Sequence, residues 1–315
     1  MSNSYNHDVQ LCGKFKLQAV QKDTGEARDL TDWFDNLVLD SGLARMATGA
    51  WITGISVGSG SSEPLVGQTG LDSFIARTTH VYSWTQGRNV SVEPYYYWSR
   101  ATYRFSPGQA AGNLSEIGAG WDNNDLWNRT LIKDLNGDPT TITVFPSEYL
   151  DVSFELRIYP NTTDVTKTIT YQEATTNGLV DVSEHTVTIR PNMTYDIPML
   201  TPYGYSTSFP ISFTSYYNNS SGATIIYSGQ LGTVVTEPTT YIGSSNTVTQ
   251  TRDATDKEIT GYVVHNIDNS VGSHRSVVIE TSIGSFKFEY DPPIEKTNTM
   301  ELTHNFSLTW GRYVT

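Results

Sequence analysis

One pattern in the sequence could mark a catalytic nucleophile. Residues 54–58 read GISVG, which fits the G-x-S-x-G motif in which a serine lies at a sharp strand-to-helix turn. The next twelve residues, 59–70, are rich in Gly and Ser and include Pro64, so they do not favour the helix that the motif requires. We therefore interpret Ser56 as part of a strand end and loop, and we expect no catalytic residue there.

A calcium loop is a second chemical possibility. Residues 134–138 read DLNGD, like the start of such a loop. Pro139 stands where the loop needs glycine, however, and Phe145 stands where it needs a bidentate glutamate. An Asn-Gly pair between two β-rich runs is instead typical of a hairpin turn, and we expect a turn here.

Histidine and cysteine are the remaining metal-binding candidates. Cys12 is the only cysteine, so the chain can form no internal disulfide, and we expect a buried or half-buried thiol. The histidines show no spacing that is typical of a metal site. They are His7, His80, His185, His265, His274 and His304. The sequence predicts neither a metal nor a cofactor.

Composition and charge disfavour several classes of function. The net charge of −13 repels nucleic-acid phosphates, and Lys and Arg occur singly rather than in a basic stripe. No apolar run approaches the roughly 20 residues that a membrane helix needs, and the first residues resemble no secretory signal. Glycoside cleavage needs two opposed carboxylates, and no pair stands out among 33 acidic residues. We expect no nucleic-acid binding, no membrane insertion and no enzymatic activity.

Alternation with period two is the strongest structural signal. Residues 148–159 place apolar side chains on one face and polar ones on the other, and residues 300–310 repeat this pattern with His304 on the apolar face. At His304 we expect a hydrogen-bonded core histidine or an interface residue. Shorter alternations include Phe15/Leu17/Ala19, Tyr103/Phe105, Ile142/Val144, Val187/Ile189 and Phe286/Phe288/Tyr290. Strands of this kind predict antiparallel sheets packed as sandwiches.

The chain offers one helix candidate and one domain boundary. Residues 39–47 place Leu39, Leu43 and Met46 on one helical face, although Gly42 weakens the helix. Pro160 and the Asn/Thr-rich run after it favour a boundary. The sequence therefore predicts an all-β fold with two antiparallel β-sandwich-like domains and one short helix in the N-terminal half. The expected domains are residues 1–160 and 161–315.

Several ordered segments carry a resemblance to a known family. Residues 13–46 contain a W-F-x-N-L-(I/V)-x-D-x-G-L stretch, and the run ISVGSGSSEP follows at residues 55–64. The matching residues are Trp33, Phe34, Asn36, Leu37, Val38, Asp40, Gly42 and Leu43. Together with residues 102–121, 128–160 and 286–313, this stretch resembles virion structural proteins of tailed bacteriophages, of the tail-fibre or collar (neck) type. Residues 161–285 show no such resemblance.

The resemblance implies a non-enzymatic β-rich protein of the virion tail or neck, made in the host cytoplasm. It transfers no catalytic motif. The partners that it implies are copies of the chain itself, in a symmetric homo-oligomer, and other tail or neck proteins.

Aromatic clusters are the candidate contact residues. Neighbouring residues of a strand face opposite ways, so runs of adjacent aromatics must place some rings outward, where they favour contact with a subunit or a sugar. The C-terminal strand ends in aromatics and an arginine, a composition enriched at interfaces, although it could equally close its own sheet. The candidates are Tyr95, Tyr96, Tyr97, Trp98, Tyr216, Tyr217, Trp310, Arg312 and Tyr313.

Three functions remain open at this stage. The leading interpretation is a structural virion subunit that works by oligomerisation and docking. The alternative is a receptor-binding adhesin that grips host surface glycans with a sandwich face and with loops such as residues 203–221. A polysaccharide-cleaving tail enzyme comes third, because the chain shows no β-helix repeat.

Overall fold

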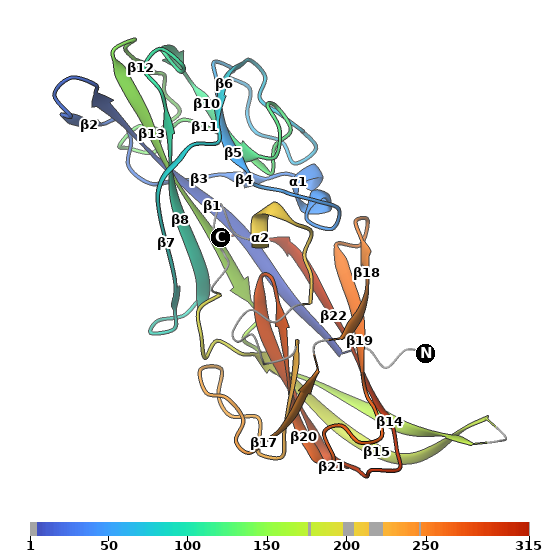
Figure 1. Cartoon of the computed structure of the whole chain (residues 1–315). Coiled ribbons are helices and arrows are strands. Elements are labelled where there is room, and N and C mark those ends of the chain that lie inside the picture. The colour runs from blue at the N-terminus through green and yellow to red at the C-terminus, as the bar shows by residue number, and fades with distance from the viewer. Residues whose placement is uncertain (1–4, 176–177, 198–204, 214–222, 246, 315) are drawn as a thin grey trace.

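Strands dominate the computed structural model, which describes residues 5–175, 178–197, 205–213, 223–245 and 247–314 (Figure 1). The largest sheet, called the large sheet below, contains β1 (Tyr5–Gln21), β2 (Ala27–Asp29), β3 (Phe34–Asp35), β7 (Val81–Asn89), β8 (Tyr96–Phe105), β13 (Glu148–Pro160), β18 (Val248–Asp253), β19 (Glu258–His265) and β22 (Leu302–Arg312). Its order is β18-β19-β22-β1-β13-β8-β7, with β2 and β3 paired to β1. The predicted all-β class is confirmed.

Three smaller sheets complete the fold. A five-stranded sheet contains β4 (Leu37–Val38), β5 (Gly54–Gly58), β6 (Phe74–Thr78), β10 (Glu116–Gly120) and β11 (Asn128–Leu131). A six-stranded sheet contains β14 (Val165–Thr175), β15 (Gly178–Pro191), β16 (Thr224–Tyr227), β17 (Tyr241–Ser245), β20 (Gly272–Thr281) and β21 (Gly284–Lys296). The third pairs β9 (Gly112–Leu114) with β12 (Ile142–Val144).

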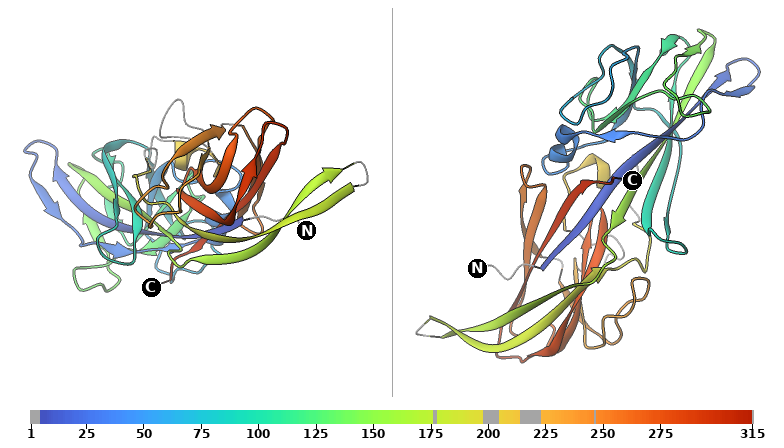
Figure 2. Two further views of the ribbon diagram at one scale, coloured as in Figure 1. Left: turned by 90° about the horizontal axis from the view of Figure 1, so that it is seen from below. Right: turned by 180° about the vertical axis from the view of Figure 1, so that it is seen from behind.

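The molecule is elongated, and β1 runs along much of its length (Figures 1 and 2). The odd-numbered residues of β1 from His7 to Ala19 face the core. Near one end, His7 stacks on Phe286 of the six-stranded sheet at 5.3 Å between ring centroids. Further along β1, Phe15 contacts Phe154 of β13. The Phe154 ring also contacts the ring of Trp127, the residue before β11. One apolar face of the large sheet is therefore covered by the five-stranded and six-stranded sheets. The period-two pattern predicts this packing of sheet on sheet.

The predicted boundary at residue 160 falls at the last residue of β13. Residues 5–11 of β1 pair in parallel with residues 306–312 of β22, and residues 9–21 of β1 pair antiparallel with residues 148–160 of β13 on the other edge. Strands from both sides of the boundary thus share one sheet and one continuous core. The division into two domains at residue 160 stays a prediction. Such a division would cut through the large sheet, in which β1 and β22 pair from opposite sides of residue 160.

The predicted helix is present as α1 (Asp40–Arg45), with Leu39, Leu43 and Met46 buried. A Cβ atom at Gly42 would lie 2.5 Å from the Trp127 Cα atom. Gly42 therefore allows the helix to lie directly against the chain that enters β11, which the helix propensity scale does not reveal. A second helix, α2 (Tyr205–Ser208), has four residues and was not predicted.

Candidate functional site

The outward face of β8 and β13 carries ion pairs that cover its carboxylates. The Arg104 Nε and Nη2 atoms each donate to Asp151 at 2.7 Å. Arg100 and Arg157 both donate to Glu155, from Nε at 2.9 and 2.6 Å. The sequence places these acidic residues on the polar face of a half-buried strand, and they lie on that face. The period-two pattern did not predict that the arginines would bury Asp151 and Glu155.

Aromatic rings lie against the same arginines. The Arg104 guanidinium lies 3.7 Å from the Tyr82 ring centroid, and Arg100 lies 4.7 Å from that of Trp33. Further pairs join Arg104 to Tyr149, Arg100 to Trp98 and Arg157 to Tyr96. We call this surface the arginine–aromatic face and define it by Arg100, Arg104, Arg157, Trp33, Tyr82, Tyr96, Trp98 and Tyr149. Stacking and ion pairing hold its side chains in place before any partner arrives.

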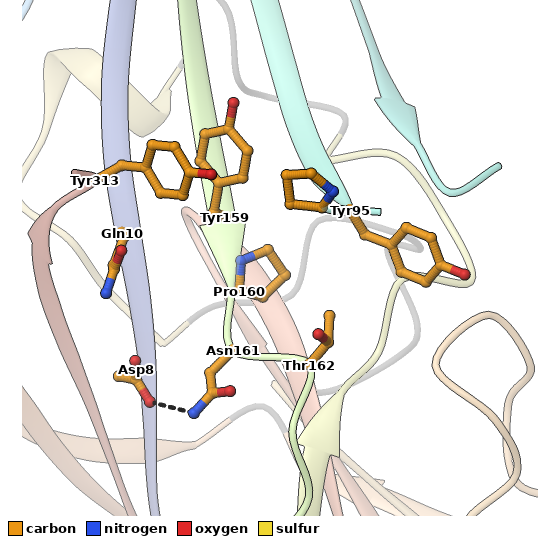
Figure 3. Close-up of a pocket in the computed structure, with 9 residues that line it drawn as sticks. Asp8, Gln10, Tyr95, Tyr159, Pro160, Asn161, Thr162 and Tyr313 are labelled. Carbon is orange, nitrogen blue, oxygen red and sulfur yellow. Dashed lines mark hydrogen bonds between the residues drawn. The ribbon is translucent and has the colours of Figure 1, made fainter. Parts of the chain in front are cut away.

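An open pocket of about 320 Å³ is lined by Tyr159 (Figure 3), whose ring contacts Tyr96 of this face. It forms where β1, β13, the end of β22 and the segment before β8 meet. The lining residues are Asp8, Gln10, Pro94, Tyr95, Tyr159, Pro160, Asn161, Thr162 and Tyr313. Its volume is at the lower end of the range for small-molecule sites.

Stacked tyrosines form one wall of the pocket. Tyr313 lies on Tyr159 with ring centroids 3.9 Å apart and planes inclined by 11°, and Tyr96 contacts Tyr159 at 5.2 Å. The Tyr313 backbone N–H also donates to the Leu11 carbonyl at 2.9 Å. Burial raises the pKa of Tyr159 to about 12, so its hydroxyl stays neutral. The Tyr159–Tyr313 stack therefore gives the pocket a packed aromatic wall.

A carboxylate and an amide lie side by side along the lower edge of the pocket in Figure 3. The Asn161 Nδ2 atom donates to Asp8 Oδ1 at 3.0 Å, and the backbone N–H of Asn161 donates to the Asp8 carbonyl at 3.1 Å. The Thr163 N–H donates to Asn161 Oδ1 at 3.0 Å. This last bond fixes which end of the amide faces Asp8.

The other candidate contact residues divide between surface and core. Tyr95 lines the pocket with Tyr313, while Tyr96 and Trp98 lie on the arginine–aromatic face. Tyr97 is buried and its hydroxyl donates to the Asn192 carbonyl at 2.8 Å. Tyr216 and Tyr217 lie outside the described residues. The expectation that some rings of the 95–98 run point outward is confirmed.

The C-terminal candidates fasten β22 to the rest of the chain. Trp310 is buried, and its Nε1 atom donates to the Leu43 carbonyl at 2.9 Å. Arg312 donates to the Val38 carbonyl at 2.6 Å and to Asp40 at 2.8 Å. These side chains therefore tie β22 to α1 and β4. The strand itself lies between β19 and β1 in the large sheet, and a place in the chain's own sheet is one of the two roles expected for it.

The sequence motifs that could have marked a catalytic or metal site occupy strands and turns in this fold. Ser56 lies inside β5 with no helix after it, is fully buried, and donates to the Asn123 carbonyl at 2.8 Å. Residues 134–138 form the expected turn, in which the Asp134 N–H donates to the Asp138 carbonyl. Cys12 is half-buried, as expected, and burial raises the pKa of its thiol to about 11.

Three histidines that are far apart in sequence meet in the core. His265, His274 and His304 lie with ring centroids 5.4 to 5.6 Å apart, and the expected hydrogen-bonded environment of His304 is confirmed. No group of three or more His, Cys, Asp or Glu within the described part of the chain has a geometry that could hold a metal ion.

No described helix is long and apolar enough to cross a membrane.

Sequence reasoning missed Asp8, Tyr159 and Asn161 as pocket residues. Asp8 and Asn161 are separated by more than 150 positions, and only the pairing of β1 with β13 brings them together.

The chain matches no protein family model, no curated protein and no solved structure.

Proposed function

We propose that this chain is a non-enzymatic structural subunit of a tailed-phage virion, in the tail, tail fibre or neck. It works by assembling with copies of itself and by docking to other virion proteins. The phage assignment rests on the resemblance of residues 13–46, 55–64, 102–121, 128–160 and 286–313. The arginine–aromatic face is the observation that supports action through contacts.

The composition of this face suits a protein interface. Trp, Tyr and Arg are the residue types most enriched at the energetic centres of interfaces. On this face Arg100 and Arg104 are already paired with Glu155 and Asp151 and with aromatic rings. A partner therefore need not order these long side chains, and this lowers the entropic cost of binding.

The test combines light scattering with labelling of particles. We expect the full chain to assemble to a multiple of its 35.0 kDa mass and an antibody against it to label tails or necks in negative stain. Trp98→Ala should weaken assembly or attachment to particles. Trp84→Ala is the matched control, because Trp84 pairs with Ala101 in β8 and so faces the opposite side of the large sheet.

Two results would contradict this proposal. One is a monodisperse 35.0 kDa monomer that also fails to attach to particles. The other is labelling of the native chain by a serine-reactive fluorophosphonate at Ser56, which would indicate catalysis. We expect no labelling, because Ser56 is enclosed in β5.

A further inference from the structure

We infer that the pocket between Tyr95 and Tyr313 binds a neutral pyranose, either free or as the terminal unit of an oligosaccharide. The inference rests on the geometry of this pocket alone and is independent of the structural role proposed above. Of residues 203–221, the loop that the sequence suggested for glycan contact, residues 203–204 and 214–221 lie outside the described residues.

Aromatic surface is the first requirement of a pyranose site. The C–H groups of one sugar face are apolar and slightly positive, so they pack on the negative face of an aromatic ring. Tyr313 and Tyr95 stand on opposite sides of Pro160 in the pocket (Figure 3). Because Tyr313 is already stacked on Tyr159 at 3.9 Å, it loses little freedom when a ligand arrives.

Paired acceptors and donors are the second requirement. Asp8 uses Oδ1 to accept from Asn161 Nδ2 at 3.0 Å, and its carboxylate has a second oxygen that can accept from a hydroxyl. The Asn161 amide likewise has a second N–H that can donate. An acceptor and a donor side by side match two adjacent hydroxyl groups of a sugar. Gln10, which is exposed on the same edge of the pocket, adds another amide.

Charge and donor chemistry narrow the ligand class. Among the described residues of the lining, Asp8 alone is charged. The chain carries a net charge of −13, so acidic sugars are repelled. Proline-rich peptides also dock in aromatic grooves, but they present carbonyl groups that need donors. A carboxylate can only accept hydrogen bonds when it is ionised. A ligand rich in hydroxyl donors therefore fits Asp8 better than such a peptide.

The experiment screens the full chain against methyl pyranosides of glucose, galactose, mannose, N-acetylglucosamine and N-acetylgalactosamine. Saturation-transfer NMR identifies the ligand and calorimetry measures its affinity. We expect at least one neutral sugar to bind, and Tyr313→Ala to weaken that binding about tenfold. Tyr313→Phe keeps the ring and should retain binding. Asp8→Ala should also weaken binding about tenfold, because a hydrogen bond to a charged group is lost.

Controls and competing ligands make the result decisive. Tyr262→Ala removes another partly exposed tyrosine, on β19 outside the pocket, and should leave sugar affinity unchanged. Circular dichroism and thermal unfolding verify that each variant is folded. The inference is overturned if no neutral sugar binds the folded chain, or if Tyr313→Ala and Asp8→Ala bind as well as the parent. It is equally overturned if N-acetylneuraminic acid, choline or a proline-rich peptide binds this pocket and the neutral sugars do not. Sugar binding by a chain that never assembles would leave the inference standing and would count only against the structural role.

Discussion

His304 Nε2 lies 3.1 Å from His274 Nδ1 in the core between the large sheet and the six-stranded sheet. His274 Nε2 lies 2.6 Å from the Ser270 carbonyl, which can only accept, so this nitrogen carries the proton. Burial lowers the pKa of His274 to about 4, so at neutral pH its Nδ1 carries no proton and accepts from His304 Nε2–H, while His304 Nδ1 accepts from the Tyr290 hydroxyl at 2.6 Å. These contacts therefore assign both histidines as neutral, each in a single tautomer.

This arrangement resists protonation of the histidines. A second proton on His274 would point at the Nε2–H of His304, and burial already lowers the pKa of His304 well below its usual value. Burial, together with the neighbouring His274 and Lys296, lowers the pKa of His265 to about 4. Burial likewise lowers the pKa of His274 to about 4. The unfolded chain has ordinary histidines, so it binds more protons than the folded chain between pH 6.5 and 4.

We therefore expect the free energy of unfolding to be highest above about pH 6.5 and to fall as the pH drops towards 4. For His265 and for His274 the loss should be on the order of 3 kcal/mol. Urea titrations at pH 7.5, 6.0 and 5.0 measure it, and about 2 kcal/mol of each loss should be present by pH 5.0. His274→Gln should make the profile less steep but not flat, because His265 and His7 also have a pKa lowered to about 4. His80→Gln, at an exposed position, should leave the slope unchanged. A parent profile that is flat across this range would contradict the assignment of neutral buried histidines.

The large sheet should depend strongly on Phe154. This side chain is 4% exposed, and its ring lies 5.0 Å from that of Phe15 and 6.4 Å from that of Trp127. Phe154→Ala should lower the free energy of unfolding by about 3–5 kcal/mol, because it leaves a cavity between sheets. Ser153→Ala, on the opposite face of β13, should change it by less than about 1 kcal/mol. Chemical denaturation compares the two, and equal losses would mean that the face assignment is wrong.

Local periodicity explains which features the sequence predicted. Residues 148–159 reveal their buried face because each side chain alternates with the backbone pleat, and β13 confirms it. The same pattern could not show that Arg100 lies directly across from Glu155, and Arg104 from Asp151, since this depends on strand register. The sequence therefore predicted the polar face of this strand but not the burial of its acidic residues.

Long-range pairing explains which features were missed. Asp8 meets Asn161 only because β1 pairs with β13. His265, His274 and His304 come from β19, β20 and β22, so their spacing in sequence carries no sign of the cluster. By helix propensity alone, Gly42 weakens the predicted helix. Glycine is needed there because a Cβ atom would collide with the backbone of Trp127, which is more than 80 residues away in sequence.

Gly42→Ala tests that close approach. The added methyl group would lie 2.5 Å from the Trp127 Cα atom, and because backbone cannot rotate away, α1 must shift. We expect a loss of about 1–3 kcal/mol in unfolding free energy, despite the better helix propensity of alanine. Gly67→Ala is the matched control, since a Cβ atom there meets nothing within 4 Å. A neutral or stabilising Gly42→Ala would refute the packing argument.

Two truncations of the C-terminus should distinguish the residues that stabilise the fold from the residue that lines the pocket. Deletion of residues 310–315 removes Trp310, which is 3% exposed and donates to the Leu43 carbonyl at 2.9 Å. That deletion should cost about 3–5 kcal/mol or more of unfolding free energy. Deletion of residues 313–315 keeps Trp310 and Arg312 and should leave the fold within about 1 kcal/mol of the parent, while removing the Tyr313 wall. Thermal unfolding of both truncations is the measurement. If the shorter deletion were as damaging as the longer one, the stacking of Tyr313 on Tyr159 would be a main support of β22.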